Sequence, residues 1–250
     1  MSGIERRAAR AIERQLAYQQ ARAARLRSSA VRVMAWMAQR SAAVRARLAA
    51  IKPIPDDARV LEVGCGAHGL ILFFGTSEAV GVDPLADHYR TMLPDWQNRV
   101  RTIAASGEAL PFPDASFDVV LCDNVVDHAE DPRRIIAEIE RVMKPGALLY
   151  FEVNVHHPLY RAAAALHAGW RALGLPYEIT PFADHTYHFT RDGAARLFEG
   201  LALKKASESD TIAVETRRQR QAPLRRPSDL LKRLFFKNAA YEVIAIKTTG

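Results

Sequence analysis

The sequence predicts an α/β protein built on a doubly wound, mostly parallel β-sheet. Short apolar segments recur along the chain and alternate with helical patterns, which is typical of parallel strands covered by helices on both faces. A glycine-rich bend, Gly64 to Gly69, follows the first of these segments. The second apolar segment ends in an acidic residue, Asp83. Both features are typical of a nucleoside-binding βαβ unit.

The expected strands lie near 58–63, 79–83, 99–104, 117–122, 147–153, 201–207 and 241–247. Helices are expected between the first five strands. The best-marked helix begins with Asp131 as N-cap and Pro132 at the first helical position. Lys144-Pro145-Gly146 is expected to end it. Thr190 is expected to cap another helix that runs to about residue 199.

The composition is that of an ordinary globular protein. The chain has 250 residues, of which 49% are hydrophobic and 25% charged. No apolar run approaches the ~20 residues that span a bilayer, and the amino terminus lacks the pattern of a secretion signal. Cys65 and Cys122 therefore read as reduced thiols, and a cytoplasmic location is expected. An arginine-rich mitochondrial transit peptide is the alternative interpretation of the amino terminus.

The formal net charge of +7 is unevenly distributed. Residues 1–52 carry a net charge of +10, residues 217–237 carry +7, and the stretch between them carries −10. Such basic arms can bind nucleic acid, anionic lipid or an acidic substrate, and they can equally dock on the acidic body of the same protein.

We expect a basic helical arm over 1–52 and a second, larger domain over 53–250. Within that domain, 154–189 forms an insertion on the acceptor side and 217–237 a basic insertion. Met37, Val44, Leu48 and Ile51 recur at helical spacing in the arm. The arm is expected to cover the ligand cleft, pair with another subunit or lie on a surface.

The glycine bend and Asp83 predict an adenosine-containing ligand. Asp83 stands 19 positions after Gly64, close to the ~20 expected where a carboxylate accepts hydrogen bonds from both ribose hydroxyls. The run Gly64-x-Gly66-x-x-Gly69 also satisfies the dinucleotide fingerprint, so a nicotinamide-dependent oxidoreductase is one alternative.

Four further motifs narrow the choice. They are Val60-Leu61-Glu62-Val63-Gly64-Cys65-Gly66, Glu108-Ala109-Leu110-Pro111-Phe112, Ser116-Phe117-Asp118-Val119-Val120 and Arg141-Val142-Met143-Lys144-Pro145-Gly146. In this order and spacing, residues 58–153 resemble the class I S-adenosylmethionine-dependent methyltransferases, in particular the small-molecule, type 11-like group. The resemblance implies a Rossmann-like sheet of seven strands with an antiparallel last strand. It also implies S-adenosyl-L-methionine as cofactor.

The same resemblance assigns residues to the cofactor. The loop Gly64, Cys65 and Gly66 would meet its methionyl part with backbone N–H groups. Asp83 would hold the ribose, with Pro84 stiffening the turn. Gly107 and Glu108 would contact the adenine edge.

Asp123 and Asn124 would line the floor of the site near the sulfonium. The sulfonium is a cation that carboxylates such as Glu62 and Asp123 accommodate.

Two residues depart from the family pattern. His68 stands where a third glycine is usual, so we expect the turn to widen or His68 to enter the cleft. Ser106 replaces an acid that often precedes the adenine contact.

His128 is the candidate catalytic base, because it follows a strand end that faces the cofactor. Asp127 is expected to orient the imidazole ring or to point into solvent. The alternative for His128 is a structural role. The run Asn124-x-x-Asp127-His128 matches a metal-binding Glu-x-x-Glu-His pattern of related O-methyltransferases, but its first position has lost the charge, and no metal is predicted.

Polar side chains are expected to roof the acceptor pocket: His156, His157, His185, Tyr187 and His188. Trp170 and Phe182 are expected to wall the pocket or to fill core. The set favours a hydroxyl acceptor, so we predict methyl transfer to an oxygen of a small molecule or sugar. RNA held by the basic arms is one alternative acceptor, although base N-methyltransferase motifs are missing. Contact with a membrane surface is another, through Leu230, Leu231, Lys232, Arg233, Leu234, Phe235 and Phe236.

Overall fold

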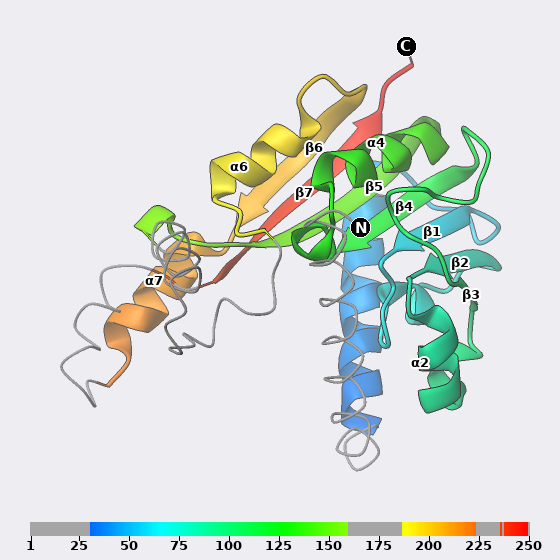
Figure 1. Cartoon of the computed structure of the whole chain (residues 1–250), viewed down its shortest axis with the longest axis horizontal. Coiled ribbons are helices and arrows are strands. Elements are labelled where there is room, and N and C mark those ends of the chain that lie inside the picture. Colours follow the sequence, from blue (N-terminus) through cyan, green and yellow to red (C-terminus); the bar gives the residue numbers. More distant parts are fainter. Residues whose placement is uncertain (1–30, 160–186, 224–235, 237, 250) are drawn as a thin grey trace, which may run out of the picture.

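A computed structural model describes residues 31–159, 187–223, 236 and 238–249. Its centre is a seven-stranded sheet with the order β3-β2-β1-β4-β5-β7-β6. The strands are β1 (Arg59–Val63), β2 (Glu78–Val82), β3 (Arg101–Ile103), β4 (Phe117–Asp123), β5 (Met143–Val155), β6 (Leu203–Asp210) and β7 (Ala239–Lys247). Figure 1 shows the sheet with helices on both of its faces.

The pairing confirms the predicted sheet. β1 to β5 pair in parallel, and β7 runs antiparallel to both of its neighbours, β5 and β6. β5 begins at Met143, four residues before the expected start, because Phe117 pairs with Met143 before an irregularity shifts the register. Lys144-Pro145-Gly146 therefore lies inside this irregular start of β5, and the preceding helix ends at Val142.

The helices are α2 (Ala86–Met92), α3 (Pro94–Gln97), α4 (Pro132–Val142), α6 (Arg191–Ala195) and α7 (Ile212–Gln221), with 3₁₀ turns η1 (Leu70–Phe73), η2 (Val126–His128) and η4 (Arg196–Phe198). A further helix covers residues 31–51. The expectation of a helix in every connection was wrong for the segment 104–116, which has none. Pro111 and Pro113 remove backbone donors there, and Gly107 disfavours helix.

The caps of α4 and α6 confirm two sequence predictions. The Asp131 carboxylate accepts from the backbone N–H groups of Arg133 and Arg134, and Pro132 opens α4. The Thr190 hydroxyl accepts from Gly193 N–H at the start of α6. Each cap satisfies backbone donors that a helix leaves without a partner in its first turn.

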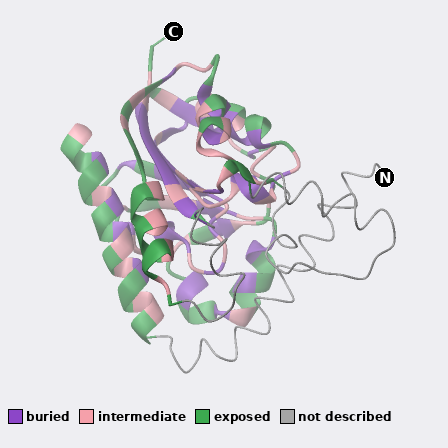
Figure 2. Ribbon diagram, turned by 90° about the vertical axis from the view of Figure 1, so that its left-hand side faces the viewer, coloured by how far each residue is buried: buried purple, intermediate pink, exposed green. Residues whose placement is uncertain are grey.

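Two apolar clusters cover the two faces of the sheet. Alternate residues of the strands enter one cluster or the other, as with Leu121 and Cys122 on β4. α4, α6 and η4 pack on one face, while α2, α3 and the helix over 31–51 pack on the other. Figure 2 shows the buried strands between helices whose outer faces are exposed.

The helix over 31–51 shares this core with the sheet. Met37, Val44 and Leu48 are buried in the same cluster as strand residues of β1, β4 and β5. The half of the basic arm that the structure describes therefore lies on the sheet. The domain boundaries placed at 1–52 and 53–250 stay a prediction, and so does the extent of both insertions.

No helix in the described ranges is long and apolar enough to cross a membrane. α7 opens the basic insertion and buries none of its residues. Most of the apolar run proposed for membrane contact, 230–235, lies outside the described residues. Phe236 of that run is buried in the core at 6% exposure, so it is not a surface anchor.

Cys65 and Cys122 are both buried and free, as expected for reduced thiols.

Candidate active site

The strand order places the switch point of the sheet at the carboxyl ends of β1 and β4, and we call the region at this edge the crevice. From β1 the chain proceeds to β2 on one side of the sheet, and β4 and β5 lie on the other side. Ligands of open α/β sheets bind at such a switch point. Val63 pairs with Cys122, so the loop that begins at Gly64 and the end of β4 at Asp123 lie level with each other.

Two glycines of the loop after β1 adopt backbone conformations that other residues rarely adopt. Gly64 and Gly66 have φ angles of 71° and 53°, a region that favours glycine. A Cβ atom at Gly64 would also lie 2.3 Å from a methyl group of Val125. The N–H groups of Gly64 and Cys65 donate to the Val82 carbonyl oxygen, which ties the loop to the end of β2.

Asp83 holds the same loop from the end of β2. Its Oδ2 accepts from Gly66 N–H at 2.9 Å, and its Oδ1 accepts from Leu85 N–H at 2.8 Å. Burial raises the pKa of Asp83, while these two bonds and the charge of His128 act in the opposite direction. A carboxylate has about four acceptor sites, so Asp83 retains capacity for a ribose diol.

Glu62 lies beneath the loop rather than in open contact with the crevice. It is 1% exposed, and its two oxygens accept from the N–H groups of Leu70 and Ile71 at 3.1 and 2.8 Å. Burial raises the pKa of Glu62 to about 8. The side chain therefore caps η1, and its predicted contact with the sulfonium stays a prediction.

His68 does not need to widen the turn, because the next residue, Gly69, takes the crowded position. A Cβ atom at Gly69 would lie 2.4 Å from Glu62 Oε2. The His68 ring packs edge-on against Trp96, with 4.7 Å between the ring centroids. Gln97 of α3 secures this part of the loop by donating to the carbonyl oxygens of Gly66 and Ala67.

The segment after β3 reaches the same edge. A Cβ atom at Gly107 would lie 2.7 Å from Val63 Cγ1, so only glycine allows this approach to β1. Glu108 Oε1 accepts from the N–H groups of Glu130 and Asp131 at 2.7 and 3.0 Å and thus holds the entry to α4. Ser106 Oγ accepts from Glu108 N–H. The adenine contacts of Gly107 and Glu108 stay a prediction.

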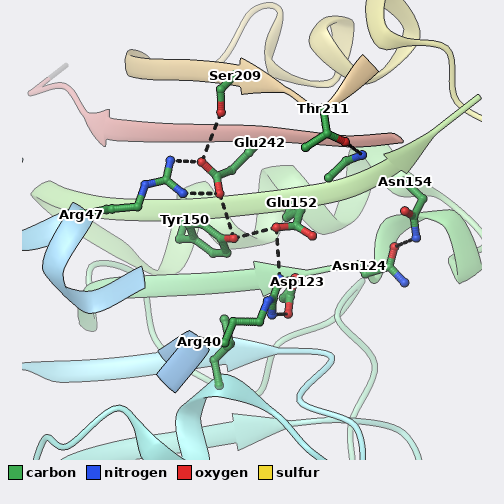
Figure 3. Close-up of polar contacts among 12 residues, drawn as sticks. Arg40, Arg47, Asp123, Asn124, Tyr150, Glu152, Asn154, Ser209, Thr211 and Glu242 are labelled. Atoms are coloured by element: carbon green, nitrogen blue, oxygen red, sulfur yellow. Dashed lines mark hydrogen bonds and ion pairs between the residues drawn. The ribbon is translucent and has the colours of Figure 1, made fainter. Parts of the chain in front are cut away.

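Asp123, at the end of β4, is paired with a residue that the sequence interpretation did not select. Arg40, on the helix over 31–51, donates to both carboxylate oxygens of Asp123, with Nη2 at 2.8 Å from Oδ1. The same Nη2 lies 3.1 Å from Oε2 of Glu152 on β5. Figure 3 shows Arg40 reaching these two acids.

The polar contacts continue across the sheet to β7. The Tyr150 hydroxyl lies 2.8 Å from Glu152 Oε2 and 3.0 Å from Glu242 Oε2. Arg47 donates to both carboxylate oxygens of Glu242. The alternative in which the basic arm docks on the acidic body is thus observed for Arg40 and Arg47 (Figure 3).

Asn124 turns the chain out of β4 in an unusual conformation. Its φ angle is 55°, in the left-handed region that few residues other than glycine adopt, although asparagine tolerates it. Its Oδ1 accepts from Asn154 Nδ2 at 2.6 Å (Figure 3). Strained residues of this kind concentrate at functional sites. The predicted place of Asn124 near the sulfonium stays a prediction.

His128 lies in η2, next in the chain after this turn. Its side chain is 35% exposed, and Nε2 is 3.9 Å from Oδ1 of Asp127. The charge of His128 acts on Asp83, which places the imidazole within electrostatic reach of the proposed ribose site. Asp127 is fully buried, so the alternative in which it points into solvent was wrong.

Two of the predicted roof histidines lie together. The rings of His156 and His188 meet edge-on with centroids 5.1 Å apart, and His156 N–H donates to the Phe189 carbonyl oxygen. Tyr187 N–H donates to the Asp127 carbonyl oxygen, which brings the segment 187–189 onto η2. His157 lies apart from this pair, against the ring of Phe236. His185, Trp170 and Phe182 lie outside the described residues.

The sequence interpretation missed Arg40 and Glu152. Arg40 was one of eleven arginines in a basic arm, and the signal that could have selected it is its position on the helix face that carries Met37, Val44 and Leu48.

Within the described ranges, no group of three or more histidine, cysteine or acidic side chains is arranged to hold a metal ion.

The fold and the site together define a class of protein. A doubly wound sheet with an antiparallel last strand, a glycine loop after β1 and an acid after β2 is the arrangement of class I S-adenosylmethionine-dependent methyltransferases. A family model described as a methyltransferase domain matches residues 61–151. The chain therefore contains a methyltransferase domain of this class.

Individual relatives agree with this assignment. The thiol S-methyltransferase TMT1B of Rattus norvegicus is 32% identical over 115 residues, which are 43% of this chain and 47% of that protein. The chain thus spans about half the length of this relative. A candidate methyltransferase of Bacillus halodurans superposes with a TM-score of 0.58 at 15% identity, over 82% of this chain and 99% of that one.

A second similar structure contains ligands. It is the geranyl diphosphate C-methyltransferase of Streptomyces coelicolor in complex with Mg²⁺, geranyl diphosphate and S-adenosyl-L-homocysteine. It superposes with a TM-score of 0.56 at 15% identity, over 83% of this chain and 79% of that one. At this identity the likeness supports the fold.

Proposed function

We propose that this protein transfers a methyl group from S-adenosylmethionine to an oxygen of a small molecule or sugar. The observation that carries the proposal is the arrangement at the end of β1, β2 and β4. Asp83 fixes the glycine loop at Gly66 from the end of β2, and His128 lies in η2, which follows β4. Donor and acceptor sites would therefore share one edge of the sheet.

The donor would bind along this edge. Asp83 would accept hydrogen bonds from the ribose hydroxyls. The N–H groups of Gly64, Cys65 and Gly66 already donate to Val82 and Asp83, so the loop would serve the methionyl part through close approach of its backbone. Gly107 and Glu108 would lie along the adenine. The match to the methyltransferase domain supports this donor over the dinucleotide of the alternative interpretation.

Methyl transfer to a hydroxyl is an in-line displacement. The acceptor oxygen attacks the methyl carbon, the carbon–sulfur bond breaks, and its electron pair stays on sulfur, which leaves as a neutral thioether. Much of the rate enhancement comes from holding the two atoms in line. The hydroxyl proton must also be removed, and His128 would accept it. Buried Asp127, 3.9 Å away, would favour the imidazolium that results.

The proposal also names oxygen as the atom that receives the methyl group. The rat relative is named a thiol methyltransferase and the Streptomyces structure a carbon methyltransferase. The polar pair His156 and His188, beside Tyr187 and η2, supports a hydroxyl-bearing acceptor for this chain. Cytoplasmic location and peripheral membrane contact through 217–237 stay predictions.

Two substitutions test the proposal. Asp83→Ala should weaken binding of S-adenosylhomocysteine by about 2–3 kcal/mol in calorimetry, because two charge-assisted bonds to the ribose are lost. His128→Ala should lower kcat at least tenfold in a transfer assay with hydroxyl acceptors and leave that affinity within twofold. His88→Ala, which removes an exposed histidine of α2, is the matched control. Absence of any heat with donor or product for the wild type would contradict the proposed function.

A further inference from the structure

Three carboxylates stand at directly paired positions on neighbouring strands. Asp123 of β4 pairs with Glu152 of β5, and Glu152 pairs with Glu242 of β7. We call these three residues the acid row. Paired residues point to the same face of a sheet and lie about 5 Å apart, so their like charges repel. Burial raises the pKa of Glu152, and the charges of Asp123 and Glu242 raise it further.

Two arginines of one helix face meet the acid row. Arg40 contacts Asp123 and Glu152, and Arg47, about two helical turns later, contacts Glu242. The Arg40, Asp123 and Glu152 side chains are 22%, 15% and 24% exposed, so water screens their charges only in part. A guanidinium stays protonated at any physiological pH. It therefore supplies a permanent positive charge where the acids would otherwise bind a proton.

The two ends of the acid row lie at different distances from the crevice. Asp123 follows the residue that pairs with Val63, so it stands beside the glycine loop. Glu242 lies two strands further along the sheet, beyond β5. Arg40 and Arg47 thus make similar contacts from one helix (Figure 3), and those of Arg40 are nearer the glycine loop.

We propose that Arg40 is a positioning residue that makes the preference of the crevice for the cationic donor over its neutral product independent of pH. It acts through Asp123 and Glu152, because its charge lowers the pKa of Glu152, which burial and the neighbouring acids raise. Two carboxylates and one guanidinium carry a net charge of −1. S-adenosylmethionine differs from S-adenosylhomocysteine by one positive charge on sulfur, and a fixed negative charge nearby favours the donor. This inference rests on the proposed function, since it requires that the crevice bind this donor.

Other ionisable groups lie around Asp123 and the acid row: Arg40 and Arg47 of the helix over 31–51, Glu62 of β1, Cys122 of β4, Tyr150 and Glu152 of β5, and Glu242 of β7. Burial raises the pKa of Glu62 to about 8 and that of Tyr150 further above its ordinary value, so both hold their protons below neutrality. Arg47 neutralises Glu242. Loss of Arg40 would therefore raise the pKa of Glu152 further, so that Glu152 takes up a proton as the pH falls.

The test measures the dissociation constants of S-adenosylmethionine and S-adenosylhomocysteine by calorimetry at pH 5.5, 6.5 and 7.5. In the wild type, the ratio of the two constants should vary less than twofold. In Arg40→Met, the preference for the donor should rise with pH by about fivefold, the effect of one unit charge near the sulfonium at an intermediate dielectric constant. Arg47→Met is the matched control and should behave as the wild type.

Two more variants complete the design. Arg40→Lys restores a positive charge and should return the ratio to a flat profile. If Arg40→Met does not fold, Asp123→Asn should lower the preference for the donor about fivefold at every pH. A flat ratio in Arg40→Met that binds both ligands would overturn this inference alone. A wild type that binds neither ligand would overturn the proposed function and this inference with it.

Discussion

Single side chains at the crevice combine support of the backbone with ligand chemistry. Asp83 holds Gly66 and Leu85 through its two oxygens at the end of β2. Glu62 supports the backbone from a buried position, and its oxygens accept from the N–H groups of Leu70 and Ile71. Glu62 is more deeply buried than Asp83, and this burial raises the pKa of Glu62 to about 8.

Glu62 should make stability depend on pH. The folded protein keeps a proton on Glu62 up to about pH 8, whereas the unfolded chain loses it near the ordinary value of 4.5. The stabilisation is thus fully present below pH 4.5, falls as the pH rises, and is lost above about pH 8. Relative to Glu62→Gln, the free energy of unfolding of the wild type should fall by about 3 kcal/mol between pH 5.5 and 7.5. Urea denaturation at both pH values measures it; parallel pH profiles for the two proteins would contradict the assignment.

At the scale of elements, the helix over 31–51 was expected from the sequence, and its position on the sheet was one of several alternatives. Its residues Met37, Val44 and Leu48 enter the core. Its residues Arg40 and Arg47 form ion pairs with the acid row. Apolar burial supplies most of its docking energy, because partly exposed ion pairs contribute little. The ion pairs fix its register on the sheet instead.

Leu48→Ala tests this docking. Leu48 is fully buried, so its truncation should lower the free energy of unfolding by roughly 2–5 kcal/mol. Val31→Ala on the same helix removes a side chain that is 81% exposed and should change stability by less than about 0.5 kcal/mol. Both values come from urea denaturation followed by circular dichroism. Equal and small effects of the two substitutions would mean that the helix is not packed on the sheet.

At the scale of the whole molecule, the sheet separates two apolar clusters, and each strand contributes to one or both of them. The helix over 31–51 belongs to one cluster and α4 to the other. A cluster on either face loses its support if the sheet is lost. We therefore expect the helix and the sheet to unfold together.

Hydrogen exchange can follow this cooperativity. Amides of residues 37–48 should exchange as slowly as those of β4, within about tenfold, because both need global unfolding. Amides of α7, which buries none of its residues, should exchange much faster and serve as the internal control. Fast exchange across 37–48 alongside a protected β4 would show an arm that folds separately from the domain.

The sequence by itself determined the sheet, the glycine loop, Asp83 and the caps of α4 and α6. These features depend on local patterns, such as apolar alternation, glycine at positive φ and capping residues, which can be read over a few positions. The tertiary structure alone decided that Arg40 meets Asp123 and Glu152, that Asp127 is buried and that Gly69 rather than His68 meets Glu62. Arg40 meets Asp123, which is 83 positions away in the sequence, and Glu152, which is 112 positions away. Pairings at such separations depend on strand order and register, which no local pattern specifies.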